Sequence, residues 1–137
     1  SMTDAKIRLA LFYLYLREAY TRRKQMTFKN YDDFVGLLET CNFKVAEADF
    51  SKPVETPFIA YFKDEDKNVY ADGKVIFTLY SKIDIELYTD RTDHASEEKF
   101  AEWLNSNNLV WKKTNRAWIA AEKMCVSYYE VRVDYKI

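Results

Sequence analysis

The sequence predicts an α+β fold: a mainly antiparallel sheet with helices packed on one face, plus an extra N-terminal helix. Hydrophobic periodicity runs in the order helix, several strands, helix, several strands, without the regular alternation that builds a parallel sheet. One segment also alternates apolar and polar residues over about 12 positions, as a half-buried strand does. The 137 residues are 48% hydrophobic and 17% aromatic, with two Gly and two Pro, so a real core and short loops are expected.

Two segments are expected, an N-terminal helical extension over residues 1–25 and a single α+β domain over residues 26–137. Residues 4–24 lack Gly and Pro and favour one helix. Its apolar run, residues 9–16, is far shorter than a bilayer span and is followed by basic residues rather than a small-residue cleavage site. The run is apolar on more than one face, so the helix requires a partner surface.

A different account of the extension concerns its coding sequence. Residues 22–26 read Arg-Arg-Lys-Gln-Met, which AGG-AGG-AAA-CAA-ATG would encode. That string is a ribosome-binding site followed by a start codon. On this hypothesis the native protein begins at Met26, the leading helix is translated upstream sequence, and Ser1 is left over from tag removal. Arg codons other than AGG in the gene would contradict it.

The first half of the domain combines one helix with short strands. A helix is expected over residues 31–41, capped by Asn30 and ended by Asn42 in a left-handed conformation. Short strands are expected at 43–48 and 57–62, on either side of a loop with two prolines. Residues 64–68 predict a polar turn, residues 69–70 a brief return strand, and Asp72-Gly73 a tight turn.

The clearest strand covers residues 77–88. One face is apolar and the other polar; the apolar face carries Phe77, Leu79, Ile83, Ile85 and Leu87. Ser81 interrupts that apolar face, so a bend or bulge is expected near Ser81-Lys82.

The second half repeats the order of helix and strands. Asp93 or Ser96 is expected to cap a helix whose apolar stripe is Phe100, Trp103 and Leu104, and Glu97 suits its positive N-terminal end. Asparagines at residues 105–108 end it. Strands are expected at 109–113, 117–123 and 126–133, with a hairpin turn at 114–116.

Charge and cysteine content narrow the function classes. Residues 1–25 hold six basic and two acidic residues, a balance of +4, and the other 15 basic and 20 acidic residues give −5. The domain is therefore mildly acidic, which disfavours nucleic-acid binding. Cys41 and Cys125 are expected to be free, buried and reduced, which suits a cytosolic protein.

Three polar clusters invite a chemical interpretation, and each has a simpler one that we favour. Asp90, Asp93 and His94 could bind a metal or exchange protons, but a polar strand-to-helix turn explains them. Residues 64–66 could bind a divalent cation, but a solvated hairpin tip explains them. Asp84 and Glu86 could be paired carboxylates, but a solvated or subunit-facing surface is more typical.

No nucleophile motif or phosphate-binding glycine loop occurs in the sequence. We therefore expect no enzyme activity, no cofactor and no bound metal. Tyr80, Tyr88 and Tyr128 could stack on bases, but their polar neighbours are mostly acidic. Because tyrosine is also enriched at protein contacts, a protein interface is the favoured interpretation.

From about Met26 onward the chain resembles the small tail-completion, or tail terminator, proteins encoded in the head-to-tail region of long-tailed phages and prophages of Gram-positive bacteria. Each matching stretch is short, but together they span about 75 residues in the right order. They are Pro57 to Tyr61 (PFIAY), Tyr70 to Lys74 (YADGK), Ile85 to Asp90 (IELYTD) with Asp93, then Glu97, Ala121 to Lys123 (AEK), and Tyr129-Glu130.

This resemblance implies a structural protein that assembles with itself as a hexameric ring on a finished tail tube. It implies the major tail tube protein and the head connector proteins as partners, no membrane, and DNA passing through without specific binding. It places the protein in the host cytoplasm during assembly and then in the virion tail. From the surface pattern, the residues expected to contact tube or neighbour are Asp64, Glu65, Asp66, Tyr70, Asp72, Lys74, Asp84, Glu86 and Tyr88.

Three other functions stay open on the sequence. One is a related head–tail connector (neck) protein, which belongs to the same class but occupies another position. Another is a small cytosolic protein-binding module, such as an inhibitor or immunity-type protein. The last, a hydrolase or nuclease that uses the acidic residues, is disfavoured by the missing catalytic motif.

Overall fold

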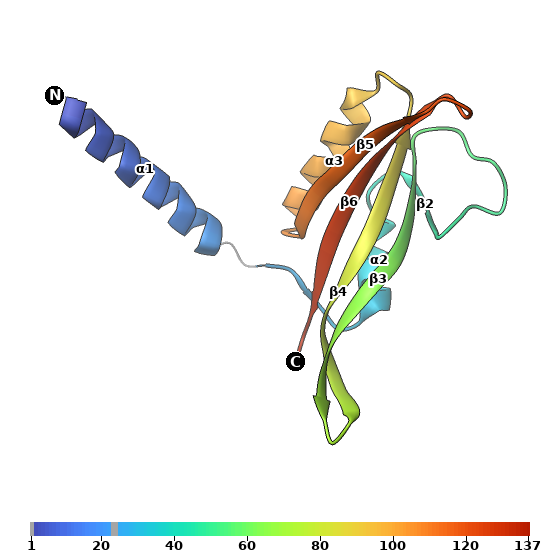
Figure 1. The fold of residues 1–137 in the computed structure, drawn as a ribbon, viewed down its shortest axis with the longest axis horizontal. Coiled ribbons are helices and arrows are strands. Elements are labelled where there is room, and N and C mark those ends of the chain that lie inside the picture. Colours follow the sequence, from blue (N-terminus) through green and yellow to red (C-terminus); the bar gives the residue numbers. More distant parts are fainter. Residues whose placement is uncertain (1, 23–24) are drawn as a thin grey trace.

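The computed structural model describes residues 2–22 and 25–137. They form the predicted α+β fold, with a mixed sheet and helices (Figure 1). The elements are α1 (Met2–Arg22), β1 (Thr27–Phe28), α2 (Tyr31–Leu38), β2 (Lys44–Glu47), β3 (Phe58–Ala71), β4 (Lys74–Thr89), α3 (His94–Ser106), β5 (Val110–Ile119) and β6 (Met124–Tyr135).

The strands form one sheet in the order β1-β6-β4-β3-β2, and β5 pairs with β6. The long pairs β3–β4, β4–β6 and β5–β6 are antiparallel. The short pairs β1–β6 and β2–β3 are parallel. The sheet is therefore mixed, and the antiparallel prediction holds for its long strands. β1 was not predicted, because two residues are too few to show a period.

The core lies on one face of the sheet, between the strands and helices α2 and α3 (Figure 1). Alternate residues of β4 and β6 face it, and two residues of each helix meet them. These side chains are Ile83, Ile85, Leu87, Tyr129, Val131 and Val133 from the sheet, and Phe34, Leu38, Phe100 and Leu104 from the helices. Burial of each such side chain stabilises the fold by about 1.5–3 kcal/mol. The predicted one-sided arrangement is confirmed.

Helix caps follow the sequence closely. The Asn30 side chain accepts a hydrogen bond from the Asp33 amide at 2.9 Å. Asp93, rather than Ser96, caps α3, because its carboxylate accepts from the Ser96 amide at 3.1 Å. Helix α2 ends at Leu38, earlier than predicted, and Asn42 adopts the expected left-handed conformation with φ 65°.

The polar turn predicted at residues 64–68 is wrong. These residues continue β3, which runs unbroken to Ala71 and pairs with β4 as far as Lys74. Residues 69–70 are consequently not a return strand. Charged residues fit in this part of β3 because its backbone pairs with β4 while the side chains from Phe62 to Lys67 remain exposed to solvent. Between β3 and β4 the chain reverses at the predicted turn, with Asp72 at φ 53° and Gly73 at φ 73°, the geometry of a two-residue hairpin.

The hairpin turn predicted at residues 114–116 is also wrong. Strand β5 is continuous from Val110 to Ile119, and Thr114 is an extra residue between the pairs of Lys113 and Asn115. A bulge thus absorbs the polar residues that suggested a turn. The chain instead reverses between Ile119 and Met124, where Lys123 has φ 52°.

The alternation predicted for β4 is confirmed from Ser81 to Leu87, and Ser81 is fully buried on the inward face, but the predicted apolar residues Phe77 and Leu79 are not buried. The irregularity expected near Ser81-Lys82 is present, but the extra residue is Asp64 on β3, opposite Lys82 and Ile83. Cys41 and Cys125 are free and buried, as predicted.

Helix α1 is confirmed as a single helix but lies apart from the sheet (Figure 1). All its described side chains, residues 3–16, are exposed. The partner surface that its apolar residues require is therefore not supplied by the other residues that the structure describes. Among the described residues, no helix is long and apolar enough to cross a membrane.

Candidate assembly interface

No helix of the described residues covers the face of the sheet opposite α2 and α3, and we call this face the open face. It follows from the strand alternation, because every second residue of β4 and β6 points away from the core. Its central side chains are partly exposed: Tyr80, Lys82, Asp84, Glu86 and Tyr88 from β4, and Tyr128, Glu130 and Arg132 from β6.

The open face contains a hollow of about 320 Å³, lined by Phe62, Asp84, Ile85, Glu86, Thr114, Asn115, Tyr128 and Tyr129. Phe62 is 37% exposed beside it. Burial, and then the charges of Asp64, Glu130 and Glu86, raise the pKa of Asp84. One nearby cation, Lys82, lies 3.9 Å from Glu130. The hollow therefore combines aromatic surface with carboxylates that repel each other.

Tyr88 lies in this face in a fixed position. Its ring stacks on Phe58 with centroids 4.8 Å apart, and Phe50 meets Phe58 edge-on. The Tyr88 hydroxyl donates a hydrogen bond to Glu86. Burial and this hydrogen bond raise the pKa of Tyr88, so it stays a neutral donor. Glu86 and Tyr88 form a prebuilt polar and aromatic surface rather than a proton-exchanging pair.

The second exposed surface is the projecting hairpin, which we define as residues 67–80 of β3 and β4. Figure 1 shows it extending beyond the rest of the sheet. None of its residues is buried. Tyr70, Val75 and Ile76 are each more than half exposed, and Leu79 is 36% exposed. The hairpin therefore presents apolar side chains that this chain leaves without cover.

The nine residues predicted to make assembly contacts fall into separate places. Tyr70, Asp72 and Lys74 lie at the hairpin tip. Asp84, Glu86 and Tyr88 lie on the open face, roughly 30–45 Å away along the strand at about 3.3 Å per residue. Residues 64–66 lie between the two surfaces, in β3. The predicted set is thus two patches and not one.

Asp66 has contacts within the chain that the sequence does not indicate. It accepts a hydrogen bond from buried Ser81 at 2.5 Å and pairs with Lys63 at 3.1 Å. Ser81 also contacts the Tyr135 hydroxyl at 2.7 Å. Burial opposes ionisation of Asp66, but the Ser81 and Lys63 contacts outweigh it and lower the pKa. Asp66 is better explained as an anchor for the base of the hairpin than as a contact residue.

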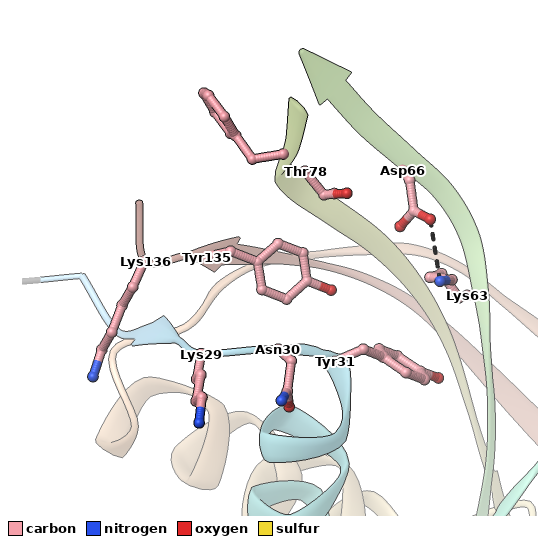
Figure 2. Close-up of a pocket in the computed structure, with 9 residues that line it drawn as sticks. Lys29, Asn30, Tyr31, Lys63, Asp66, Thr78, Tyr135 and Lys136 are labelled. Atoms are coloured by element: carbon pink, nitrogen blue, oxygen red, sulfur yellow. Dashed lines mark ion pairs between the residues drawn. The ribbon is translucent and has the colours of Figure 1, made fainter. Parts of the chain in front are cut away.

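A pocket of about 320 Å³ lies at that base and is lined by Lys29, Asn30, Tyr31, Lys63, Asp66, Phe77, Thr78, Tyr135 and Lys136 (Figure 2). Three of the lining residues are lysines from separate parts of the chain, and Lys63, which pairs with Asp66, lies 5.1 Å from the centroid of the Tyr31 ring. Sequence reasoning missed this basic pocket, because isolated lysines far apart in sequence carry no pattern.

The cluster around His94 has structural contacts. Asp93 caps α3, and Asp90 accepts a hydrogen bond from Thr56 at 2.6 Å. His94 is exposed and its Nδ1 lies 3.4 Å from Glu97. Within residues 2–22 and 25–137, no group of three or more His, Cys, Asp or Glu is placed to hold a metal ion.

Comparison of the chain with protein-family models gives no match, and comparison with curated proteins gives no significant relative.

Proposed function

We propose that this protein is a structural phage or prophage assembly protein that caps the tail tube, ends its polymerisation and forms part of the head–tail junction. It acts in the host cytoplasm during assembly and remains in the virion tail. Its partners are further copies of itself, the major tail tube protein and the head connector proteins.

The projecting hairpin is the observation that carries this proposal. An isolated two-stranded hairpin is marginally stable in water, and three or more strands or a packed face are needed for independent stability. In the described part of the chain, this hairpin has no third strand and no packed face, and it exposes Tyr70 on β3 and Val75 and Ile76 on β4. Such a ribbon is typical of an element completed by contact with another subunit.

The arrangement of the surfaces supports a ring. A closed ring requires two different patches on each subunit, which meet head to tail. The hairpin tip and the open face are two separate exposed patches that differ in chemistry: the first is apolar and suits the tube, and the second is acidic and aromatic and suits a neighbouring copy. An acidic balance also suits a channel through which DNA passes, because retention of DNA depends on neutralising its phosphates with basic residues.

Tube assembly in the presence of this protein tests the proposal. The purified chain is added to the polymerising tail tube protein of the same phage, and tube lengths are measured by electron microscopy. We expect density at one end of each tube and a shorter mean length as the chain concentration rises. Tyr70→Asp combined with Ile76→Asp should abolish both effects, because carboxylates replace the apolar contact.

Glu102→Lys is the matched control, since it changes an exposed residue of α3, away from the hairpin, and should leave capping unchanged. Tubes of unchanged length with no bound chain would contradict the proposal. Binding to the head connector but not to the tube would assign the chain to the neck instead. Binding to neither would favour the inhibitor-type module.

A further inference from the structure

Helix α1 exposes apolar side chains that no other described part of the chain covers. Leu9, Leu11, Phe12, Tyr13, Leu14 and Leu16 are each 45% to 63% exposed. Large exposed apolar surfaces of this kind mark interaction sites in soluble proteins. A helix of this kind requires a broad complementary surface, because its apolar residues are not confined to one stripe.

The open face is a second exposed surface, and unlike the apolar hairpin it is acidic and aromatic. Its centre offers Phe62 and Tyr128 together with the hollow of about 320 Å³. Asp84 lines this hollow, and the charges of Asp64, Glu130 and Glu86 act on it, so carboxylates outnumber the cations Lys82 and Arg132 of the same face. A helix that brings apolar side chains and basic residues would cover the aromatic surface and neutralise the carboxylates at once.

We propose that α1 of one copy docks on the open face of a second copy of this chain. Residues 1–25 carry a balance of +4, and Lys6 and Arg8 are exposed beside the apolar run. Because the N-terminal segment is basic and the open face is acidic, their charges are complementary and favour docking of α1 on this face. Contact between two α1 helices would instead bring like charges together.

The position of α1 fits transfer to a neighbour. Figure 1 shows the helix outside the outline of its own sheet, beyond the edge where β1 pairs with β6. An arm in this position links subunits head to tail, since the surface it leaves and the surface it enters are different. This inference goes beyond the proposed function and does not depend on a tail tube.

Cross-linking between two labelled populations of the full chain tests it. One population carries Leu11→Cys and the other Phe62→Cys, and they are mixed under mild oxidation. Cys41 and Cys125 are each only 1% exposed, so their background should be low. We expect a covalent dimer that contains one chain of each kind. Glu102→Cys replaces Phe62→Cys in the control mixture and should give no such product.

A charge swap supplies the second measurement, by light scattering of the full chain. Asp84→Lys with Glu86→Lys should weaken self-association by roughly tenfold or more, as loss of complementary interfacial charges does. Lys6→Glu with Arg8→Glu, added to that variant, should restore it. Thermal unfolding of each variant shows whether the fold is retained.

Three results would overturn the inference. One is a cross-link to Glu102→Cys as strong as that to Phe62→Cys. Another is self-association that neither charge change affects. The third is binding of α1 to vesicles of anionic phospholipid, without any chain-to-chain cross-link. A negative result in these measurements would not affect the tube-capping experiment, because that experiment tests the projecting hairpin.

Discussion

The Glu97 carboxylate connects helix α3 to two strands of the sheet. Its Oε1 accepts hydrogen bonds from Lys113 at 2.8 Å and Arg116 at 3.2 Å, and also from Ser127. Its side chain is only 11% exposed. Helix α3 is thereby tied to β5 on both sides of the Thr114 bulge and to β6. The irregular part of β5 is held by the helix beneath it.

These contacts give Glu97 a measurable pH dependence. Burial alone would raise its pKa, but the Lys113 and Ser127 hydrogen bonds and the charges of Lys113 and Arg116 lower the pKa to about 2. The folded chain therefore favours the ionised form relative to an unfolded value of 4.5. The resulting stabilisation, about 2–3 kcal/mol, is fully present above pH 4.5 and is lost as the pH falls toward 2.

We expect Glu97→Gln to lower the free energy of unfolding by about 2 kcal/mol at pH 7. The difference from the native chain should shrink steadily between pH 5 and pH 2. Urea unfolding at several pH values measures it. Glu98→Gln is the control, because Glu98 is the exposed neighbour in the same helical turn. Equal effects of the two substitutions would show that the contacts around Glu97 do not stabilise the fold.

The sequence could not distinguish these two glutamates. Both follow the Asp93 cap, and both suit the positive end of α3. The capping residues themselves were predictable, because Asn30 and Asp93 act through amides three residues away. The partners of Glu97 lie 16 to 30 residues away, so only the fold reveals them.

The β3–β4 ribbon is longer than the sequence predicted. β4 was predicted because its inward residues are apolar, from Ile83 to Leu87. The first part of β3 was predicted as the strand at residues 57–62, but its continuation was not, because residues 62–67 are exposed and their charged side chains show no alternation of apolar and polar residues. The Asp72-Gly73 turn was predictable, since only a residue pair tolerant of positive φ fits it.

Gly73→Ala tests how strongly this turn sets the hairpin. Gly73 has φ 73°, where a Cβ costs about 1 kcal/mol, although no atom lies within 4 Å of it. We expect amide hydrogen exchange in residues 67–80 to accelerate roughly fivefold, with no change in the core strands. Asp72→Asn should leave exchange unchanged, because Asn tolerates the left-handed region. Equal acceleration throughout the sheet would contradict a local effect.

Across the whole molecule, the residues that stabilise the fold lie on one face of the sheet, and the surfaces we propose for assembly lie elsewhere. The sequence predicted the apolar face and the two helices that cover it. It did not predict that the open face and the hairpin would be distinct surfaces, because that depends on β3 continuing past Phe62. Nor could it place the three lysines of the basic pocket around one cavity.

Replacing Asn68 to Leu79 with Asn-Gly tests this separation. The new turn would join Lys67 to Tyr80, which are already paired across β3 and β4. Because no residue of the hairpin is buried, the unfolding free energy should change by less than about 1 kcal/mol. Capping of tail tubes should be lost completely. Urea unfolding and electron microscopy of the same preparation give the two results, and a large loss of stability would show that the hairpin belongs to the folding unit.

The parallel pairing of β1 with β6 has a practical consequence. Thr27 lies beside Asp134, and the Lys136 amide donates to the Phe28 carbonyl at 2.8 Å. The chain thus enters β1 and leaves β6 at the same edge of the sheet, and because the strands are parallel it leaves at the end of β1 that leads to α2. A fluorescent label or affinity tag at the carboxyl terminus would emerge beside Lys29 and the basic pocket that Lys136 lines, so it would compete for space with anything bound there. A circular permutant that joins these neighbouring ends and opens between Ile119 and Met124 would move the tag to the opposite end of β6.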